Sequence, residues 1–339
     1  MGRAAVAALT ASPARPTLPG YLLRRLAASA LLLWLVLTTT FLLLRLVPGS
    51  PIGNVMELPI TRHQKELLIH AYGLDRPLPE QYLRWLGAVT LHGDWGISFA
   101  QLRPVRNVVA EALPATLLLA GAALLIEYGA GVALGVAAAS RGGSGLDRAI
   151  RLVSLLLYSQ PVFWLGLMAI LLFSYRLRWL PPSHMHAVVA DELGRGARFA
   201  DLARHLVLPA MTLGLGAAGG AARFVRASLL DVMGRDYVRT ARAKGLSERR
   251  VVWVHGGRAV LVPIIQLLGL SVPGLLSGAL ITEIVFSWPG MGRITLEAIL
   301  TRDSPVLLAT TAISATLVIG GNLVADLLQA AADPRVRDA

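Results

Sequence analysis

Six long apolar runs constrain the fold of this chain more than any other feature of its sequence. They cover residues 21–47, 114–140, 152–175, 206–230, 259–285 and 305–329. About twenty predominantly apolar residues are enough for an α-helix to cross a bilayer, and each run reaches that length. Because the bilayer core offers no water to satisfy backbone N–H and C=O groups, such runs fold as helices. The sequence therefore predicts an all-α polytopic membrane protein with six transmembrane helices.

The composition agrees with a membrane protein and excludes several other classes. Of the 339 residues, 55% are hydrophobic and only 15% are charged, which is too apolar for an ordinary soluble domain. There is no cysteine, so a disulfide framework, a thiol nucleophile and a cysteine metal site are excluded. The net charge of +12 could indicate nucleic-acid binding. The basic residues are spread over the loops between apolar runs, however, so we attribute them to membrane orientation and expect no nucleic-acid partner.

The segments between the runs give the expected domain organisation. Residues 1–20 are rich in Ala and Pro and are predicted to be a disordered tail. Residues 21–47 form the first span; a cleavable signal peptide, the alternative, would have a shorter apolar core followed by a small-residue cleavage site. We expect an external segment with short helices at 48–112, a transmembrane core at 113–330 that includes a basic loop at 231–258, and a second tail at 331–339.

The distribution of arginine and lysine indicates the orientation. Six spans place both termini on the same side of the membrane as the loop 231–258. The positive-inside rule favours the cytoplasm for that side, because both tails, the connector 141–151 and the basic loop are rich in arginine. The second external loop, 176–205, is also fairly basic and counts against this assignment. On balance we expect both termini to be cytoplasmic.

The basic loop carries a short predicted helix. Asp236 is placed to cap its N-terminus through the carboxylate. Tyr237, Val238 and Ala241 have the spacing of one helix face. Gly245 is placed to end the helix in a left-handed turn. A solvated basic connector beside anionic lipid is the alternative interpretation of this loop.

The loop also resembles a known motif. RTARAKGL (residues 239–246), followed by HGGRAVLVP (255–263), is similar to the coupling loop of ATP-binding-cassette importer permeases, in the form found in dipeptide, oligopeptide and nickel permeases. Gly256, Gly257 and Ala259 depart from the usual pattern. TEIVFSWPGMG (282–292), and NLVADLL with DPRVR between residues 322 and 337, extend the resemblance over residues 21–337.

The resemblance implies the type I ABC importer permease fold, in which a short helix of the loop docks into a groove on a separate ATPase subunit. The residues assigned to this contact are Tyr237, Arg239, Thr240, Ala241, Arg242, Ala243, Lys244 and Gly245. It also implies the other parts of an importer: a second, homologous permease, two ATP-binding subunits or domains, and an extracytoplasmic solute-binding protein. ATP and Mg would bind to the ATPase, and this chain would bind no cofactor. Such permeases form half of a translocation path in the cytoplasmic (inner) membrane of bacteria or archaea.

Peptides are the expected solute, because this form of the loop is common in di- and oligopeptide permeases. Nickel or another small solute of the same family is the alternative. A polytopic membrane enzyme is less favoured, since the sequence has no Walker A, HExxH or GxSxG motif and its intramembrane polar residues form no catalytic set. We therefore expect no enzymatic activity from this chain.

Two glycine patterns occur within the spans. Gly131 and Gly135 are four residues apart, a spacing that permits close helix contact in membranes. Gly214-x-Gly216-x-x-Gly219 matches the dinucleotide-binding fingerprint in its letters only. A true fingerprint follows a strand and opens a soluble helix, so we reject that interpretation.

Three polar residues inside the spans are candidates for the substrate path: Glu127, Gln160 and Gln266. Glu127 falls near the middle of the bilayer, where an ionisable group is a functional-site candidate that could contact a cationic end of the solute. The alternative is a protonated or hydrogen-bonded structural role. His184 and His186 could contact a metal, but surface histidines are favoured because a metal site requires a specific geometry. We expect no metal site.

Overall fold

The computed structural model describes residues 18–46, 69–70, 73 and 75–332. The predicted tails therefore fall largely outside the described residues, as does much of the predicted external segment. Apart from an isolated bridge between Ile97 and Pro104, these described parts of the chain form helices and loops without a strand. The all-α prediction is confirmed.

Ten helices of eight residues or more carry the fold of the described residues. They are α2 (Leu18–Leu46), α5 (Leu78–His92), α6 (Val105–Ser140), α7 (Gly145–Ser159), α8 (Val162–Ala169), α9 (Arg195–Met233), α10 (Asp236–Ala243), α12 (Gly257–Val285), α13 (Met291–Leu300) and α14 (Ser304–Ala332). Shorter turns of helix are η1 (Ile170–Arg176), η2 (Ala190–Glu192), α11 (Glu248–Arg250) and η3 (Val251–Gly256).

Within the described ranges, five helices are long and apolar enough to cross a membrane: α2, α6, α9, α12 and α14. The third predicted run is broken at Gln160 and Pro161, as its sequence indicates. Proline disfavours the helical conformation of the residue before it, and Gln160 is accordingly extended, with ψ 141°. The segment Gly145–Ser159 and the following segment Val162–Arg176 are bent by 104°. Counting this bent pair as one span gives six.

Two spans begin well before their apolar runs. α6 starts at Val105 and α9 at Arg195, so Pro114 and Pro209 lie inside helices instead of at their starts. In α6, tertiary packing outweighs the cost of a proline in the helix interior. Its first two turns bury two valines and an alanine against α13 and α14, in a cluster of Val105, Val109, Ala112, Met291, Ala298, Val306 and Ala309.

The α6–α9 pair forms the most extensive contact between helices, and glycines allow its close approach. A Cβ at Gly131 would lie 2.6 Å from the Ala221 Cβ, and one at Gly135 would lie 2.7 Å from the Ala222 carbonyl oxygen. The predicted close contact is therefore confirmed. Gly219 also lies in α9, where a Cβ would be 2.4 Å from the backbone carbonyl oxygen of Ser154. The fingerprint-like glycines are thus packing positions in α9.

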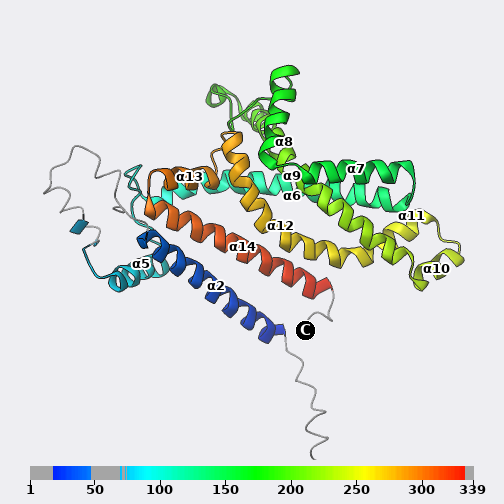
Figure 1. Cartoon of the computed structure of the whole chain (residues 1–339), viewed down its shortest axis with the longest axis horizontal. Coiled ribbons are helices and arrows are strands. Elements are labelled where there is room, and N and C mark those ends of the chain that lie inside the picture. The colour runs from blue at the N-terminus through cyan, green and yellow to red at the C-terminus, as the bar shows by residue number, and fades with distance from the viewer. Residues whose placement is uncertain (1–17, 47–68, 71–72, 74, 333–339) are drawn as a thin grey trace, which may run out of the picture.

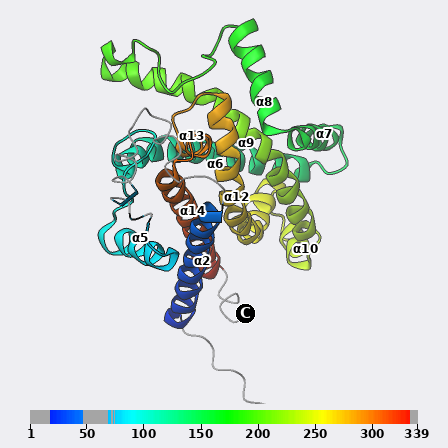
Figure 2. The same cartoon turned by 60° about the vertical axis from the view of Figure 1, so that its left-hand side comes forward.

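The arrangement has two distinct ends. In Figure 1, α10 and the connection from α6 to α7 lie at one end of the long axis, whereas α5 and the first turns of α14 lie at the other. Helices α2 and α14 run antiparallel, and both views place the start of α2 beside the end of α14 (Figures 1 and 2). An ion pair between Arg25 and Asp326 joins these two helix ends. The first described helix thus begins on the side of the molecule where the last described helix ends.

Candidate coupling site

The basic loop between α9 and α12 contains the predicted short helix, α10, with Arg235 as its N-cap residue. The prediction that Asp236 caps the helix is wrong, because Asp236 is its first residue and makes no capping hydrogen bond. Its carboxylate still lies in the first turn, where a negative charge interacts favourably with the helix dipole. Gly245 has φ +77°, so the predicted left-handed turn after the helix is confirmed. A residue with a Cβ is strained in that conformation.

One face of α10 is buried within the loop itself. Val238 is fully buried and Ala241 is 5% exposed, and both pack against Val251 in η3. Tyr237 does not share this face, contrary to the spacing argument, since it is 49% exposed. The i, i+3 pair of Val238 and Ala241 is enough to seat so short a helix, which leaves Tyr237 on its outer side.

Arg242 closes the loop. Its Nε donates a 2.6 Å hydrogen bond to the Glu248 carboxylate, and its Nη1 donates a 3.5 Å bond to the Met233 carbonyl. One side chain therefore connects the end of α9, the end of α10 and the start of α11. The structure gives Arg242 an internal role in addition to any contact with a partner.

The remaining predicted coupling residues face outward. Five of them are exposed and, together with Gly245, form one surface of the loop: Tyr237, Arg239, Thr240, Ala243 and Lys244. No side chain lies within 4 Å of where a Gly245 Cβ would be. The loop thus presents an exposed, mostly polar and basic surface on a short helix whose opposite face is fixed.

The inner side of the loop is continuous with the membrane helices. Val252 of η3 packs in a buried cluster with Val225, Leu229 and Val260, which belong to α9 and α12. Gly256, a departure from the usual motif, lies close to α9: a Cβ there would be 2.6 Å from a Leu229 methyl group, which would have to shift. Packed side chains therefore connect α10 through η3 to α9 and α12.

The opposite end of α12 contains a buried carboxyl group that sequence reasoning missed. Glu283 is fully buried. Its Oε2 accepts hydrogen bonds from the backbone N–H groups of Gly292 (2.7 Å) and Arg293 (3.2 Å), which lie in the first turn of α13. Its Oε1 accepts a 2.6 Å bond from the Thr116 hydroxyl in α6. Glu283 therefore joins α6, α12 and the N-terminus of α13.

The SWPGMG segment forms the turn around this carboxyl group. Trp288 is fully buried and its Nε1 donates a 2.8 Å hydrogen bond to the Ala115 carbonyl. A Cβ at Gly290 would lie 2.2 Å from the Glu283 Oε1, so only glycine fits there without movement. The glycines of the motif were a signal that something approaches their backbone closely, although they could not identify Glu283.

Of the three predicted path residues, the structure describes the side chains of Glu127 and Gln160. Glu127 is 5% exposed in α6, where its Oε1 accepts a 2.7 Å bond from Ser271 of α12. Its Oε2 has no hydrogen-bond partner within the described part of the chain. Gln160 is half-buried at the α7–α8 bend, and Gln266 lies in α12 with a side chain outside the description. No hydrogen bond links Glu127 to Gln160 in the described structure.

The histidines considered for metal binding have other partners. The Nδ1 atoms of His184 and His186 lie 2.9 Å from the Ser183 hydroxyl and 3.1 Å from the Asp201 carboxylate, respectively. Among the residues that the structure describes, no group of three or more His, Asp or Glu side chains is placed to hold a metal ion.

Comparison with known proteins gives consistent matches over most of the chain. A family described as "Binding-protein-dependent transport system inner membrane component" matches residues 131–338, and the N-terminal family of such membrane components matches residues 19–120. The chain is 37% identical to the oligopeptide transport system permease protein AppB of Bacillus subtilis, over 93% of this chain and 98% of that protein. It is 41% identical to the di/tripeptide permease protein DppB of Pseudomonas aeruginosa and 36% identical to the dipeptide permease protein DppB of Escherichia coli K12, each over 88% of this chain and 93% of the relative.

Proposed function

Because the chain belongs to the family of binding-protein-dependent transport system inner membrane components, we propose that it is the permease subunit of an ATP-driven peptide importer and forms half of its translocation path. The observation that carries this proposal is the identity of 36–41%, over most of the chain, to proteins named as dipeptide, di/tripeptide and oligopeptide permeases. The geometry of α10 supports it, since a short helix fixed on one face and exposed on the other suits docking to a partner.

The proposed mechanism uses α10 as a lever. An ATPase on a separate chain binds ATP and Mg, and its groove holds the exposed residues Tyr237, Arg239, Thr240, Ala243 and Lys244 with the turn at Gly245. To shift the equilibrium between the inward-open and outward-open states from 1:99 to 99:1, ATP must favour one state over the other by about 5.5 kcal/mol in binding free energy. The packed connection from α10 through η3 to α9 and α12 would transmit that bias as a rigid-body movement.

The other proposed components follow from the two ends of the molecule. A second, homologous permease supplies the other half of the path, and two ATP-binding subunits or domains contact the α10 end of the pair. A solute-binding protein delivers peptide at the end that carries α5 and the start of α14. This arrangement requires α10 and both chain termini to be cytoplasmic, in agreement with the arginine-rich segments at that end.

Glu127, Gln160 and Gln266 are the proposed contacts along the path. Glu127 supports this role best, because one of its carboxyl oxygens is buried without a partner in the described structure. A peptide ammonium group would satisfy that oxygen if α6 and α12 separate during the transport cycle. Glu127→Gln should then reduce uptake of cationic peptides more than uptake of acidic ones. Glu111→Gln, an exposed position on the same helix, is the control. If Glu127→Gln changes the uptake of cationic and acidic peptides by the same factor relative to the wild type, the path role is excluded.

The experiment that tests the function is ATP-dependent uptake in vesicles that contain the chain with its partner subunits. Labelled dipeptides and oligopeptides are expected to accumulate, and labelled nickel is not. Because the chain has no cysteine, Ala243→Cys can be cross-linked to a cysteine placed in the ATPase groove, with Ala241→Cys as a buried control. Accumulation of nickel without peptide would refute the substrate assignment. The absence of a cross-link from any exposed position of α10 would refute the coupling role.

A further inference from the structure

A cavity of about 580 Å³ lies where the end of α2 meets α5, the loop 94–99 and the start of α14. Its wall includes three arginines and two tryptophans: Arg45, Arg76, Arg84, Trp85 and Trp95. It is remote in the fold from α10, at the opposite end of the long axis in Figure 1. The coupling loop and the proposed path residues do not line it.

Aromatic stacking gives one side of the cavity a defined shape. Phe41 of α2 stacks on Trp85 of α5 with ring centroids 5.4 Å apart, and it meets the Tyr82 ring edge-on at the same distance. The Tyr82 hydroxyl lies 2.6 Å from the Thr38 hydroxyl. Helix α5 is thus attached to the outer part of α2 by a set of rings, and the cavity opens beside them.

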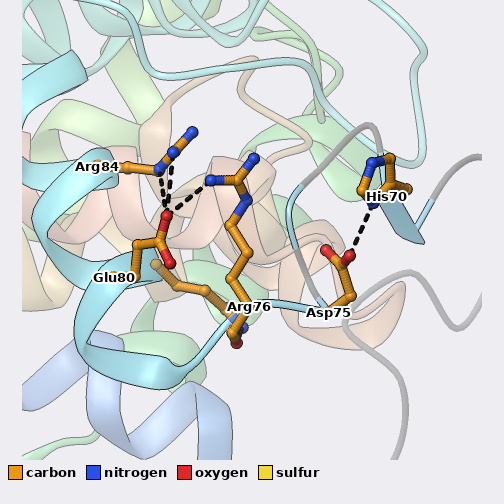
Figure 3. Close-up of polar contacts among 6 residues, drawn as sticks. His70, Asp75, Arg76, Glu80 and Arg84 are labelled. Carbon is orange, nitrogen blue, oxygen red and sulfur yellow. Dashed lines mark hydrogen bonds and ion pairs between the residues drawn. The ribbon is translucent and has the colours of Figure 1, made fainter.

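Two of the three arginines in the cavity wall share a single carboxylate. Arg76 and Arg84 both contact one carboxylate, that of Glu80, at 2.7 and 3.0 Å (Figure 3). The hydrogen bond from Arg76 lowers the pKa of the Glu80 carboxyl group, which is therefore ionised at neutral pH. A single carboxylate neutralises only one of these two guanidinium groups.

The third arginine has no carboxylate partner in the described structure. The Arg45 guanidinium lies 5.2 Å from the centroid of the Phe41 ring, in a cation–π arrangement. It is half-buried, so its charge is partly removed from water. Asp94 also lines the cavity, and its Oδ1 accepts a 2.9 Å hydrogen bond from the Gly96 N–H. The remaining carboxylate near Arg76, that of Asp75, contacts His70 at 2.7 Å, so among the described residues no carboxylate pairs with Arg45.

The surroundings of the cavity suit the membrane–water interface. On α2, three leucines within three residues of Arg45 are exposed: Leu42 at 47%, Leu43 at 57% and Leu46 at 77%. Helix α5 also exposes three leucines, Leu78, Leu83 and Leu91. Arginine and tryptophan at the end of an apolar span are typical of the depth at which lipid headgroups lie. An anion at this depth that also has apolar chains to lay against exposed leucines is a phospholipid.

We propose that this cavity binds the headgroup phosphate of an anionic phospholipid, with Arg45 and Arg84 as its cationic ligands and the exposed leucines of α2 in contact with its acyl chains. A bound lipid would stabilise the contact of α5 with α2 and α14. The proposal does not depend on which solute is transported, so its test and the uptake experiment can fail separately.

The test is a lipid titration of the purified full-length chain in detergent, in which native mass spectrometry detects the bound lipid. The probes are phosphatidylglycerol, phosphatidylcholine and inorganic phosphate. We expect one phosphatidylglycerol to be retained in preference to phosphatidylcholine. The double variant Arg45→Gln with Arg84→Gln should bind it more weakly by about fivefold for each arginine removed. Arg103→Gln with Arg106→Gln removes the same charge near the start of α6, outside the cavity, and should bind like the wild type.

If the double variant does not fold, Arg84→Gln alone is tested. The Arg84 side chain is 62% exposed, so we expect this single variant to fold. Equal retention of phosphatidylglycerol by the wild type, the control and the Arg84 variant would overturn the proposal. Displacement of the lipid by millimolar inorganic phosphate would also overturn it, because the site would then be one for soluble anions.

Discussion

Replacing Glu283 by alanine tests whether one buried carboxyl group holds α6, α12 and α13 together. The change removes the acceptor of three hydrogen bonds, from the Thr116 hydroxyl and from the N–H groups of Gly292 and Arg293. A buried donor left without an acceptor costs about 1–3 kcal/mol. A cavity of about 390 Å³ beside Glu283, also lined by Thr116 and Gly292, allows water to reach these donors. The lower end of the range therefore applies to each, so we expect a loss of about 3 kcal/mol in the free energy of unfolding.

The assay is thermal unfolding of the purified chain in detergent. The measured quantity is the fraction of protein that remains monodisperse at each temperature. A loss of about 3 kcal/mol corresponds to a fall in Tm of roughly 5–10 °C. Glu283→Gln keeps the shape and one acceptor oxygen, so its Tm should fall by a smaller amount.

Glu297→Ala is the matched control for this experiment. Glu297 lies on the exposed side of α13, where it forms an ion pair with Arg293 at 3.1 Å. An exposed pair of this kind contributes about 0–1 kcal/mol, so the Tm of the control should change little. Equal Tm values for Glu283→Ala and Glu297→Ala would refute the assignment of Glu283 as the residue that joins α6, α12 and α13.

Three further predictions concern the coupling turn, the helix packing and the topology. Gly245→Val should insert normally but abolish peptide-stimulated ATP hydrolysis, because a β-branched residue is strained at φ +77°, whereas Gly245→Asn should retain activity; normal activity of the valine variant would contradict this. Gly131→Val should lower the yield of folded protein, since even a Cβ would lie 2.6 Å from its neighbour in α9, and Gly129→Val, which has open space, should not; similar yields would exclude the packing argument. A cysteine at Ser247 should react with an impermeant reagent only from the cytoplasm and one at exposed Ala100 only from outside; the reverse pattern would contradict the six-span topology.

The positions of the membrane helices could be predicted because their signal is local. Each apolar run corresponds to a helix or, for the third run, to a helix pair broken at Gln160 and Pro161. The starts of α6 and α9 could not be predicted in this way. Pro114 and Pro209 indicate helix starts locally. Residues before Pro114 are buried against α13 and α14, which extends α6 toward the N-terminus. Before Pro209, Leu208 is buried and Leu202 and Leu206 are partly buried against a core cluster that includes residues of α6 and α12.

The coupling loop shows the same division between local and distant causes. The left-handed turn at Gly245 and the burial of Val238 and Ala241 follow from residue type and spacing. The exposure of Tyr237 was not predicted, because spacing alone does not say how wide the buried face is. Glu283 was missed since the hydroxyl group that contacts it lies 167 residues away in the sequence.

The ion pair between Arg25 and Asp326 has a consequence for the synthesis of the protein. These residues are 301 positions apart, so the first helix enters the membrane long before its partner is made. At about 5–20 residues per second, translation of the intervening chain takes about 15–60 s. Throughout that time Arg25 lacks the carboxylate that it contacts in the finished protein. The first helix reaches its final place only when the last one is inserted, so release of a truncated chain would leave an unpaired cation at the membrane surface as a mark of incomplete assembly.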